Sequence, residues 1–285
     1  MNESRRTLLT GMLAGAVMGA VGLPRLSFAA DPVTSKPMAL LLTGTSLDSM
    51  FLKGAEAAAI ESGQSIRAID TPKRAGIVDP ARVRVFLQAH RGMRVAGLVD
   101  DASYVLLCEI ARDAGIALLA EGRHGQYTHA VSRHELRVAT GLHGVADMLA
   151  AGLVRSNERF AVAERPFGAS SSLPDRDWSG HGFDSYRVGR EFPLCLHLAG
   201  VPLASACAAL DLPTAQAEPV VRVAGRPTEV PLEGEWPALL GYALCHAGSG
   251  VDVQVRGATQ VFLRGDALLR QHDKLASLVS FVMDL

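Results

Sequence analysis

Between residues 38 and 165, short apolar runs alternate with segments that have helical periodicity. The runs that predict strands occupy residues 38–43, 66–69, 95–99, 116–120, 130–131 and 160–163. The segments with apolar residues at helical spacing are 47–58, 80–87, 105–111 and 138–149. Strands that alternate with helices of this length need right-handed crossover connections and a sheet covered on both faces. We therefore predict an α/β domain over residues 38–165, built on a doubly wound parallel sheet.

The regular alternation ends at Pro166. Turn-forming residues follow it, and the pattern beyond them mixes the two periodicities, with strands indicated at 220–223, 251–255 and 259–263 and helices at 236–245 and 267–275. The apolar stretch 192–210 is interrupted by Pro193 and Pro202, which indicates a buried core segment and not a membrane span. We predict a smaller mixed α+β region over residues 166–285.

The N-terminal residues have the three parts of an export signal. The segment Ser4-Arg5-Arg6-Thr7-Leu8-Leu9 resembles the consensus of twin-arginine signals, and the uncharged core from Leu8 to Leu23 is shorter than the roughly 20 residues of a spanning helix. Small residues at Ser27 and Ala29 suit a signal peptidase. The resemblance implies a twin-arginine signal peptide over residues 1–29, a linker over 30–37, and export by the twin-arginine translocase to the periplasm with no stable membrane span after cleavage. An uncleaved membrane N-terminus is the alternative.

Charge and cysteine spacing exclude several classes of function. Without Arg5, Arg6, Arg25 and Glu3, the 28 basic and 29 acidic residues of the chain leave a net charge of −3, which argues against a nucleic-acid partner. No C-x-x-C pair occurs among the four cysteines, as an iron–sulfur centre or attached haem would need. No phosphate-binding glycine motif is present either. We therefore expect no cofactor.

Polar residues follow the predicted strands. Because ligands bind beyond the carboxyl ends of parallel strands, these residues predict a site for a small polar ligand. An N-cap role is the alternative for Ser46 and for Asp101. The predicted ligand-binding residues are Thr43, Thr45, Ser46, Asp70, Asp100, Asp101, Glu121 and Arg123.

The repeated strand-helix units of residues 38–165 resemble the first lobe of type I periplasmic binding proteins. In that family a cleft between two α/β lobes closes over a small molecule. The resemblance implies an exported small-ligand-binding protein, or an accessory protein that serves a co-exported enzyme. The region after Pro166 does not clearly repeat the alternation of a second lobe.

A second interpretation starts from Gly44-Thr45-Ser46-Leu47, which resembles the Gly-Asp-Ser-Leu block of lipase-like esterases. The resemblance implies a secreted serine hydrolase in which Ser46 is the nucleophile. Asp266 and His272 are the candidates for the rest of a triad, although they are six residues apart where the family has an Asp-x-x-His pair.

A third interpretation is a metal-binding protein that uses Cys195, His197, Cys245 and His246, a set of two sulfur and two nitrogen ligands if the two segments meet. Each pair lies in an apolar segment, so buried core residues are the alternative that we favour. The sequence does not choose among the possible disulfide pairings.

Histidines and arginines also crowd the region that follows the fourth strand. These residues indicate either a catalytic or anion-binding loop or a solvated connection, and we favour the connection. They are His124, His129, His134 and His143, with Arg123, Arg133 and Arg137.

Overall fold

The chain folds around one mixed β-sheet. The computed structural model describes residues 36–42, 46–70, 79–128, 131–139, 142, 144–167, 182–189, 194–210, 212, 214–220, 230–232, 234–248 and 278–285. The strands are β1 (Met38–Leu42), β2 (Ile66–Asp70), β3 (Arg94–Asp100), β4 (Ala117–Thr128), β5 (Val131–Val138), β6 (Arg159–Pro166), β7 (Asp184–Val188), β8 (Leu194–Ala199), β9 (Ala217–Pro219) and β10 (Leu278–Asp284). The helices are α2 (Asp48–Ser62), α3 (Pro80–Ala89), α4 (Asp101–Asp113), α5 (Val145–Arg155), α6 (Leu203–Ala209) and α7 (Trp236–Gly248), with a 3₁₀ turn at Thr214–Gln216.

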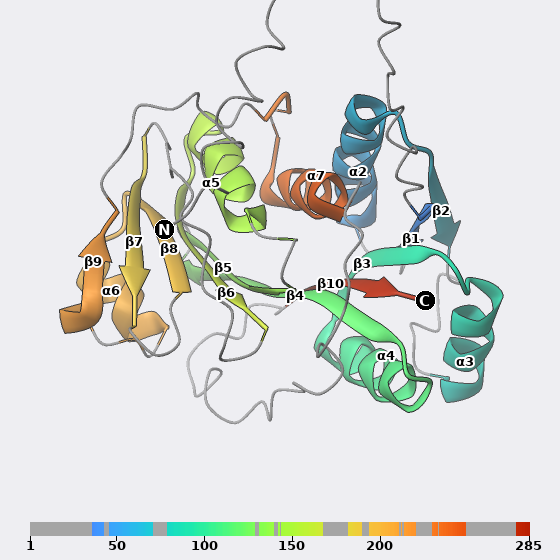
Figure 1. The fold of residues 1–285 in the computed structure, drawn as a ribbon. Helices are drawn as coiled ribbons and strands as arrows, with labels where there is room; N and C mark the ends of the chain where they lie inside the picture. Colours follow the sequence, from blue (N-terminus) through green and yellow to red (C-terminus); the bar gives the residue numbers. More distant parts are fainter. Residues whose placement is uncertain are drawn as a thin grey trace, which may run out of the picture. The chain divides into compact units, whose positions relative to one another are not determined.

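The α/β class is confirmed, but the sheet is not the doubly wound parallel sheet that the alternation predicts. Its order is β2-β1-β3-β10-β4-β5-β6-β8-β7-β9 (Figure 1). Parallel pairing joins β2 to β1, β1 to β3, and β5 to β6, and the other described neighbours are antiparallel. Two features interrupt the parallel pattern. Strand β10 lies between β3 and β4, and β4 continues directly into β5 as a hairpin with no intervening helix.

The predicted helix over 138–149 is displaced along the chain. Val138 ends β5, and α5 begins only at Val145. A buried carboxylate fixes this start: the Glu164 oxygens accept hydrogen bonds from the backbone N–H groups of Gly144 at 3.1 Å and of Ala146 at 2.8 Å. A negative charge satisfies the free donors of a helix N-terminus and complements its dipole.

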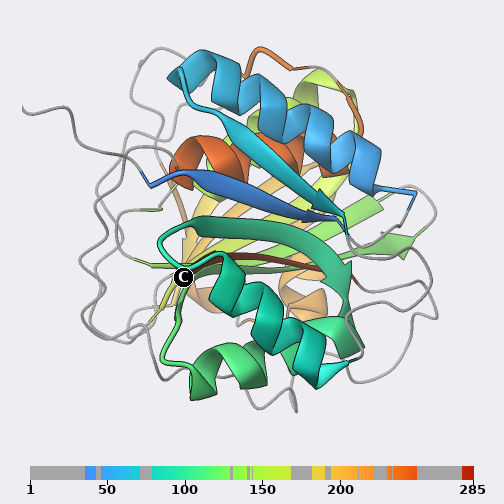
Figure 2. The same ribbon diagram turned by 90° about the vertical axis from the view of Figure 1, so that its right-hand side faces the viewer.

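Helices cover both faces of the sheet. On one face, α2, α5 and α7 pack over a large apolar cluster that includes Leu40, Leu98, Leu136 and Phe160. On the other face, α3 and α4 cover the strands β1, β3 and β10, while α6 covers β6 and β8. Figure 2 shows α2 and α7 on one side of the strands and α3 and α4 on the other. Between the apolar clusters of the second face, part of the sheet carries charged side chains.

The helices α2 and α7 approach each other closely because a glycine lies at their contact. A Cβ atom on Gly54 would lie 1.7 Å from the carbonyl oxygen of Ala238, so only glycine fits at this point of α2. The close approach packs α7 directly against α2, although the two helices are far apart in the sequence.

The region after Pro166 completes the same sheet. Strand β8 and helix α6 form the buried segment predicted within 192–210, and α7 matches the helix predicted at 236–245. Residues 34–285 form one compact unit, so the boundary expected near Pro166 does not divide the sheet. Within the described ranges, no helix combines the length and the apolar character needed to cross a membrane. The signal segment and the elements predicted at 221–223, 251–255, 259–263 and 267–275 lie outside these ranges.

Candidate functional site

Strands β4, β5 and β6 place charged side chains on one face of the sheet, and five of them are adjacent. Arg133 lies on the same face of β5 and forms an ion pair with Glu135. Glu121 on β4 pairs in register with Arg137 on β5, which in turn pairs with Arg165 on β6. Two residues along β4, Arg123 pairs with Glu135. Since alternate residues of a strand point to the same face, these side chains form two adjacent rows. The rows lie between the apolar cluster under α3 and α4 and the cluster under α6.

Glu121 is the buried carboxylate of this group, with 5% of its surface exposed. Burial raises the pKa of Glu121, and the positive charges of Arg123 and Arg137, with a hydrogen bond from Tyr104 on α4, reduce the shift without cancelling it. The Nε atom of Arg123 lies 3.8 Å from the Glu121 carboxylate. A carboxyl group in this environment takes up a proton more readily than an exposed one.

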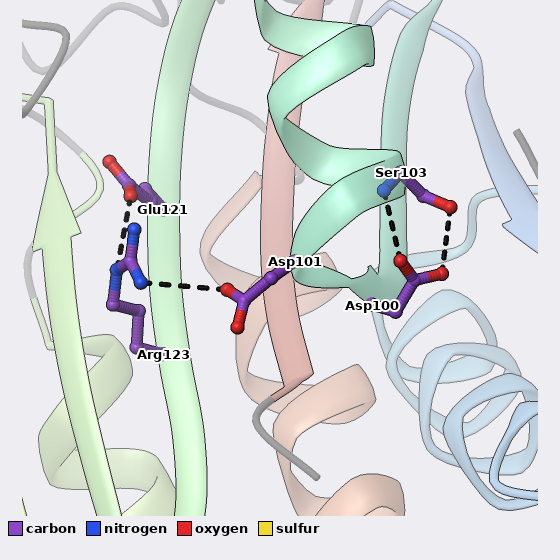
Figure 3. Close-up of polar contacts among 5 residues, drawn as sticks. All are labelled: Asp100, Asp101, Ser103, Glu121 and Arg123. Carbon is purple, nitrogen blue, oxygen red and sulfur yellow. Dashed lines mark hydrogen bonds and ion pairs between the residues drawn. The ribbon is translucent and has the colours of Figure 1, made fainter. Parts of the chain in front are cut away.

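Two neighbouring aspartates at the start of α4 have different roles (Figure 3). Asp100 is the N-cap: its carboxylate accepts from the Ser103 backbone N–H at 2.9 Å and from the Ser103 hydroxyl at 2.7 Å. Burial alone would raise the pKa of Asp100, but these hydrogen bonds outweigh it and hold the pKa below its usual value. Asp101 instead points toward Arg123, with 3.5 Å between its Oδ1 and the arginine Nη1. Glu121, Arg123 and Asp101 therefore form one chain of charges.

Arg137 lies at the centre of the charged rows, and two of its hydrogen-bond donors have no acceptor among the described residues. Its Nε and Nη1 atoms are buried and have no hydrogen-bond partner among the described residues. Burial lowers the pKa of Arg137, and the positive charge of Arg165 lowers it further against the opposing effect of Glu121. The guanidinium carbon also lies 5.8 Å from the centre of the Phe167 ring, a cation–π contact that supplies no acceptor.

A small pocket of about 40 Å³ opens at these rows. One water needs roughly 10–15 Å³ on this measure, so the pocket has room for a small functional group and not for a whole nucleotide or flavin. Its lining combines charged and apolar residues: Glu121, Arg123, Glu135, Leu136, Arg137, Ala163, Arg165, Leu194, Leu210 and Leu212. Three arginines and two glutamates give it a formal charge of +1, in a chain whose net charge is −1.

None of the other predicted ligand-binding residues that the structure describes lines this pocket. Ser46 is exposed in the turn before α2, and Asp70 is the last residue of β2 at the edge of the sheet. Strands β1, β3 and β10 separate β2 from β4. Thr43 and Thr45 lie outside the described residues. The expected rim therefore contributes Asp101, Glu121 and Arg123 to one place, while Asp100 serves its own helix.

The described residues include only Ser46 of the hydrolase candidates, and they do not bring the metal candidates together. Asp266 and His272 lie outside the described residues, so no partner of Ser46 is placed by the structure. Within the described ranges, no group of three or more histidine, cysteine or acidic residues is arranged to hold a metal ion.

The four metal candidates have separate environments. Cys195 and His197 lie on β8, where the His197 Nδ1 is 2.9 Å from the Ser185 hydroxyl. Cys245 and His246 lie on α7, where His246 stacks on Tyr242. The four cysteines are buried and form no disulfide, and burial raises the thiol pKa of both Cys195 and Cys245 to about 12.

The histidines expected in a solvated connection are instead buried in strands. His124 and His134 point to the face opposite the arginines, with their Nδ1 atoms 2.9 Å apart. The second ring nitrogen of His124 lies 2.7 Å from the Ser280 hydroxyl, and Trp236 stacks on His124. Burial lowers the pKa of His124 well below its ordinary value and that of His134 to about 3. Both rings are therefore neutral at neutral pH, and one Nδ1 donates to the other. His129 and His143 lie outside the described residues.

Arg137, Arg165 and Glu135 are the charged pocket residues that the predicted ligand-binding set lacks. For Glu135 and Arg137 a signal is present in the sequence: from Arg133 to Val138, charged residues alternate with buried ones, which is the pattern of a strand. Comparisons with protein-family models, with curated proteins and with solved structures find no match. The interpretation of the site therefore depends on its own geometry.

Proposed function

We propose that this chain is an exported binding or accessory protein whose pocket on β4, β5 and β6 holds a small anion. Arg137 carries the proposal: two of its nitrogens are buried without an acceptor among the described residues, beside a second arginine. An unsatisfied buried donor on a charged group costs stability, and like charges directly opposite each other in a sheet repel. An anion between Arg137 and Arg165 removes both costs.

The surrounding residues support a binding role. Glu121 and Glu135 offset part of the positive charge, so the pocket suits an anion of low charge. Arg123 is already engaged by Asp101 and Glu121, which leaves Arg137 and Arg165 as the residues that contact the ligand. Arginine is suited to this contact because its planar fork binds carboxylate and phosphate oxygens in pairs.

Thermal-shift and calorimetric titrations test the proposal. The protein is titrated with acetate, phosphate and sulfate at constant ionic strength, beside the variants Arg137→Gln and Arg112→Gln. Arg112 is the matched control because it pairs with Glu109 on the exposed surface of α4. We expect at least one anion to bind saturably. Its affinity should weaken about tenfold or more in Arg137→Gln, because one charge-assisted hydrogen bond is lost, and should be unchanged in Arg112→Gln. Equal weak effects of every anion on all three proteins would contradict the proposal.

The export part of the proposal rests on the N-terminal residues. We propose that Arg5 and Arg6 direct the folded chain to the twin-arginine translocase, with release into the periplasm after Ala29. Replacing both arginines by lysine should leave a longer, uncleaved chain in the cytoplasm, whereas Arg25→Lys, outside the pair, should be exported and cleaved. Cell fractionation with N-terminal sequencing of the periplasmic product distinguishes these outcomes.

A further inference from the structure

We infer that the anion is a short-chain aliphatic carboxylate, with its head group on Arg137 and Arg165 and its hydrocarbon part against Leu194, Leu210 and Leu212. This inference rests on the proposed anion site and names the chemical class of its ligand. Two features of the pocket carry it: the separation of its polar and apolar walls, and its net charge.

The walls of the pocket come from different parts of the fold. The arginines and glutamates project from β4, β5 and β6, which also contribute Leu136 and Ala163. Leu194, Leu210 and Leu212 come from β8 and from the segment at the end of α6. Leu194 and Leu210 are 2% and 3% exposed and belong to the apolar cluster under α6. Leu212 is half-buried and packs against the same cluster. A ligand on the arginines therefore meets a fixed aliphatic wall on one side.

An inorganic anion would leave the exposed part of that wall, which belongs mainly to Leu212, in contact with water. An aliphatic chain covers it and gains the free energy of removing apolar surface from water, which corresponds to about fourfold in affinity for each methylene. The leucines thus favour an anion that has a hydrocarbon part.

The charge of the pocket selects the head group. Arg123, Arg137 and Arg165 against Glu121 and Glu135 leave one net positive charge, which balances a monoanion. The ion-pair partners outside the pocket, Asp101 for Arg123 and Arg133 for Glu135, cancel each other in this sum. A phosphate dianion would lie near two carboxylates with an uncompensated negative charge. A carboxylate has one charge and two oxygens in a plane, which matches a guanidinium group.

The size of the pocket limits the chain length. About 40 Å³ encloses a carboxylate and the first carbons of its chain, and further carbons extend past the leucines. The gain for each added methylene should therefore stop within the series of short straight-chain acids.

The experiment is a titration of the protein, followed by NMR, with acetate, propionate, butyrate, valerate and hexanoate, and with phosphate and sulfate at matched ionic strength. We expect affinity to rise about fourfold for each methylene over the first members and then to level off, with phosphate and sulfate weaker than butyrate. Leu212→Ser should retain acetate binding and lose the dependence on chain length. Leu203→Ser is the matched control, because Leu203 packs against the same cluster without lining the pocket.

The outcomes separate the two proposals. Carboxylates that bind with an affinity independent of chain length, or phosphate as the tightest ligand, would overturn the inference and leave the anion site in place. A chain-length dependence that persists unchanged in Leu212→Ser would overturn the proposed wall. Absence of saturable binding by every anion would overturn the proposed function itself, and the inference with it.

Discussion

Arg137 on β5 and Arg165 on β6 are direct register partners on parallel strands, with their side chains on the same face of the sheet. Two positive charges at this spacing repel each other, and Arg137 also has buried nitrogens without an acceptor in the described structure. Compensation of the buried Glu121 carboxylate accounts for one positive charge here, but not for the second arginine or for the Arg137 donors that have no acceptor among the described residues. These two features are the observations on which the proposed anion site rests.

In a Glu121→Gln background, replacing Arg137 by methionine should make the ligand-free protein more stable while abolishing anion binding. The background is needed because Arg137 also compensates the buried Glu121 carboxylate. Methionine retains much of the side-chain volume and removes the unsatisfied donors and the repulsion from Arg165, so we expect the free energy of unfolding to rise by about 1 kcal/mol. Urea unfolding of the two proteins in buffer free of organic anions measures the change. Arg112→Met on the exposed face of α4 should have little effect. A marked loss of stability on Arg137→Met in this background would show that the free protein satisfies this guanidinium.

The affinity for the anion should increase as the pH falls through the pKa of Glu121. Burial raises that pKa, so the carboxyl group becomes neutral at a higher pH than an exposed glutamate and then no longer repels a bound anion. Titrations with butyrate from about pH 8 to about pH 5.5, where the ligand remains mostly ionised, follow the change. In Glu121→Gln the affinity should be high and nearly independent of pH. A wild-type affinity that falls on acidification would contradict this role.

The buried histidines should make the protein sensitive to acid. Burial lowers the pKa of His134 and of His197 to about 3, and lowers that of His124 also. Below the unfolded pKa of about 6.5, the unfolded chain binds protons that the folded chain does not. The free energy of unfolding therefore decreases as the pH is lowered, by up to about 1.4 kcal/mol per pH unit for each histidine. Urea unfolding between about pH 7.5 and about pH 4.5 tests this, and His134→Gln should reduce the slope. A flat profile would place these rings in contact with solvent.

Two glycines of β4 should respond differently to alanine. A Cβ atom on Gly122 would lie 2.5 Å from the Ser280 hydroxyl and 2.7 Å from the His124 ring, whereas one on Gly125 would meet no atom within 4 Å. Gly122→Ala should therefore lower the free energy of unfolding by about 2 kcal/mol or more, as expected for an overpacked core, and Gly125→Ala should change it little. Thermal unfolding of the two variants compares them directly. Similar behaviour of both would mean that the His124 and Ser280 side chains can move aside.

The positions of most early strands could be predicted from the sequence, but their order could not. Apolar runs mark β1, β3 and β6 because both sides of these strands are covered. Strand β10 has a similar run, Leu278-Val279-Ser280-Phe281-Val282-Met283, which our sequence analysis does not predict as a strand. Its partners β3 and β4 are far away in the sequence, and periodicity contains no information on which distant strands pair. The hairpin of β4 and β5 was missed because its polar residues resemble a loop.

The site could be predicted in part, because some of its residues follow apolar runs that mark strands. Asp101, Glu121 and Arg123 follow apolar runs, so the rule for strand ends selects them. Arg137 and Arg165 lie within strands and face the pocket only because the sheet register aligns them with Glu121. The rule also selects Asp70, which the inserted strands separate from the others. Residue types were therefore informative, and the missing information was the strand order.

The central position of β10 determines when the sheet can be completed during synthesis. Leu278 of β10 pairs with both Asp100 on β3 and His124 on β4, so β10 joins the two parts of the sheet. Because β10 follows every other described strand in the sequence, the ribosome synthesises it after them. A nascent or truncated chain that lacks residues 278–284 has unpaired backbone groups on β3 and β4. These are two exposed strand edges that can pair with other chains. Final assembly must therefore follow translation of this strand, and a chaperone that shields those edges until then would protect the chain from aggregation.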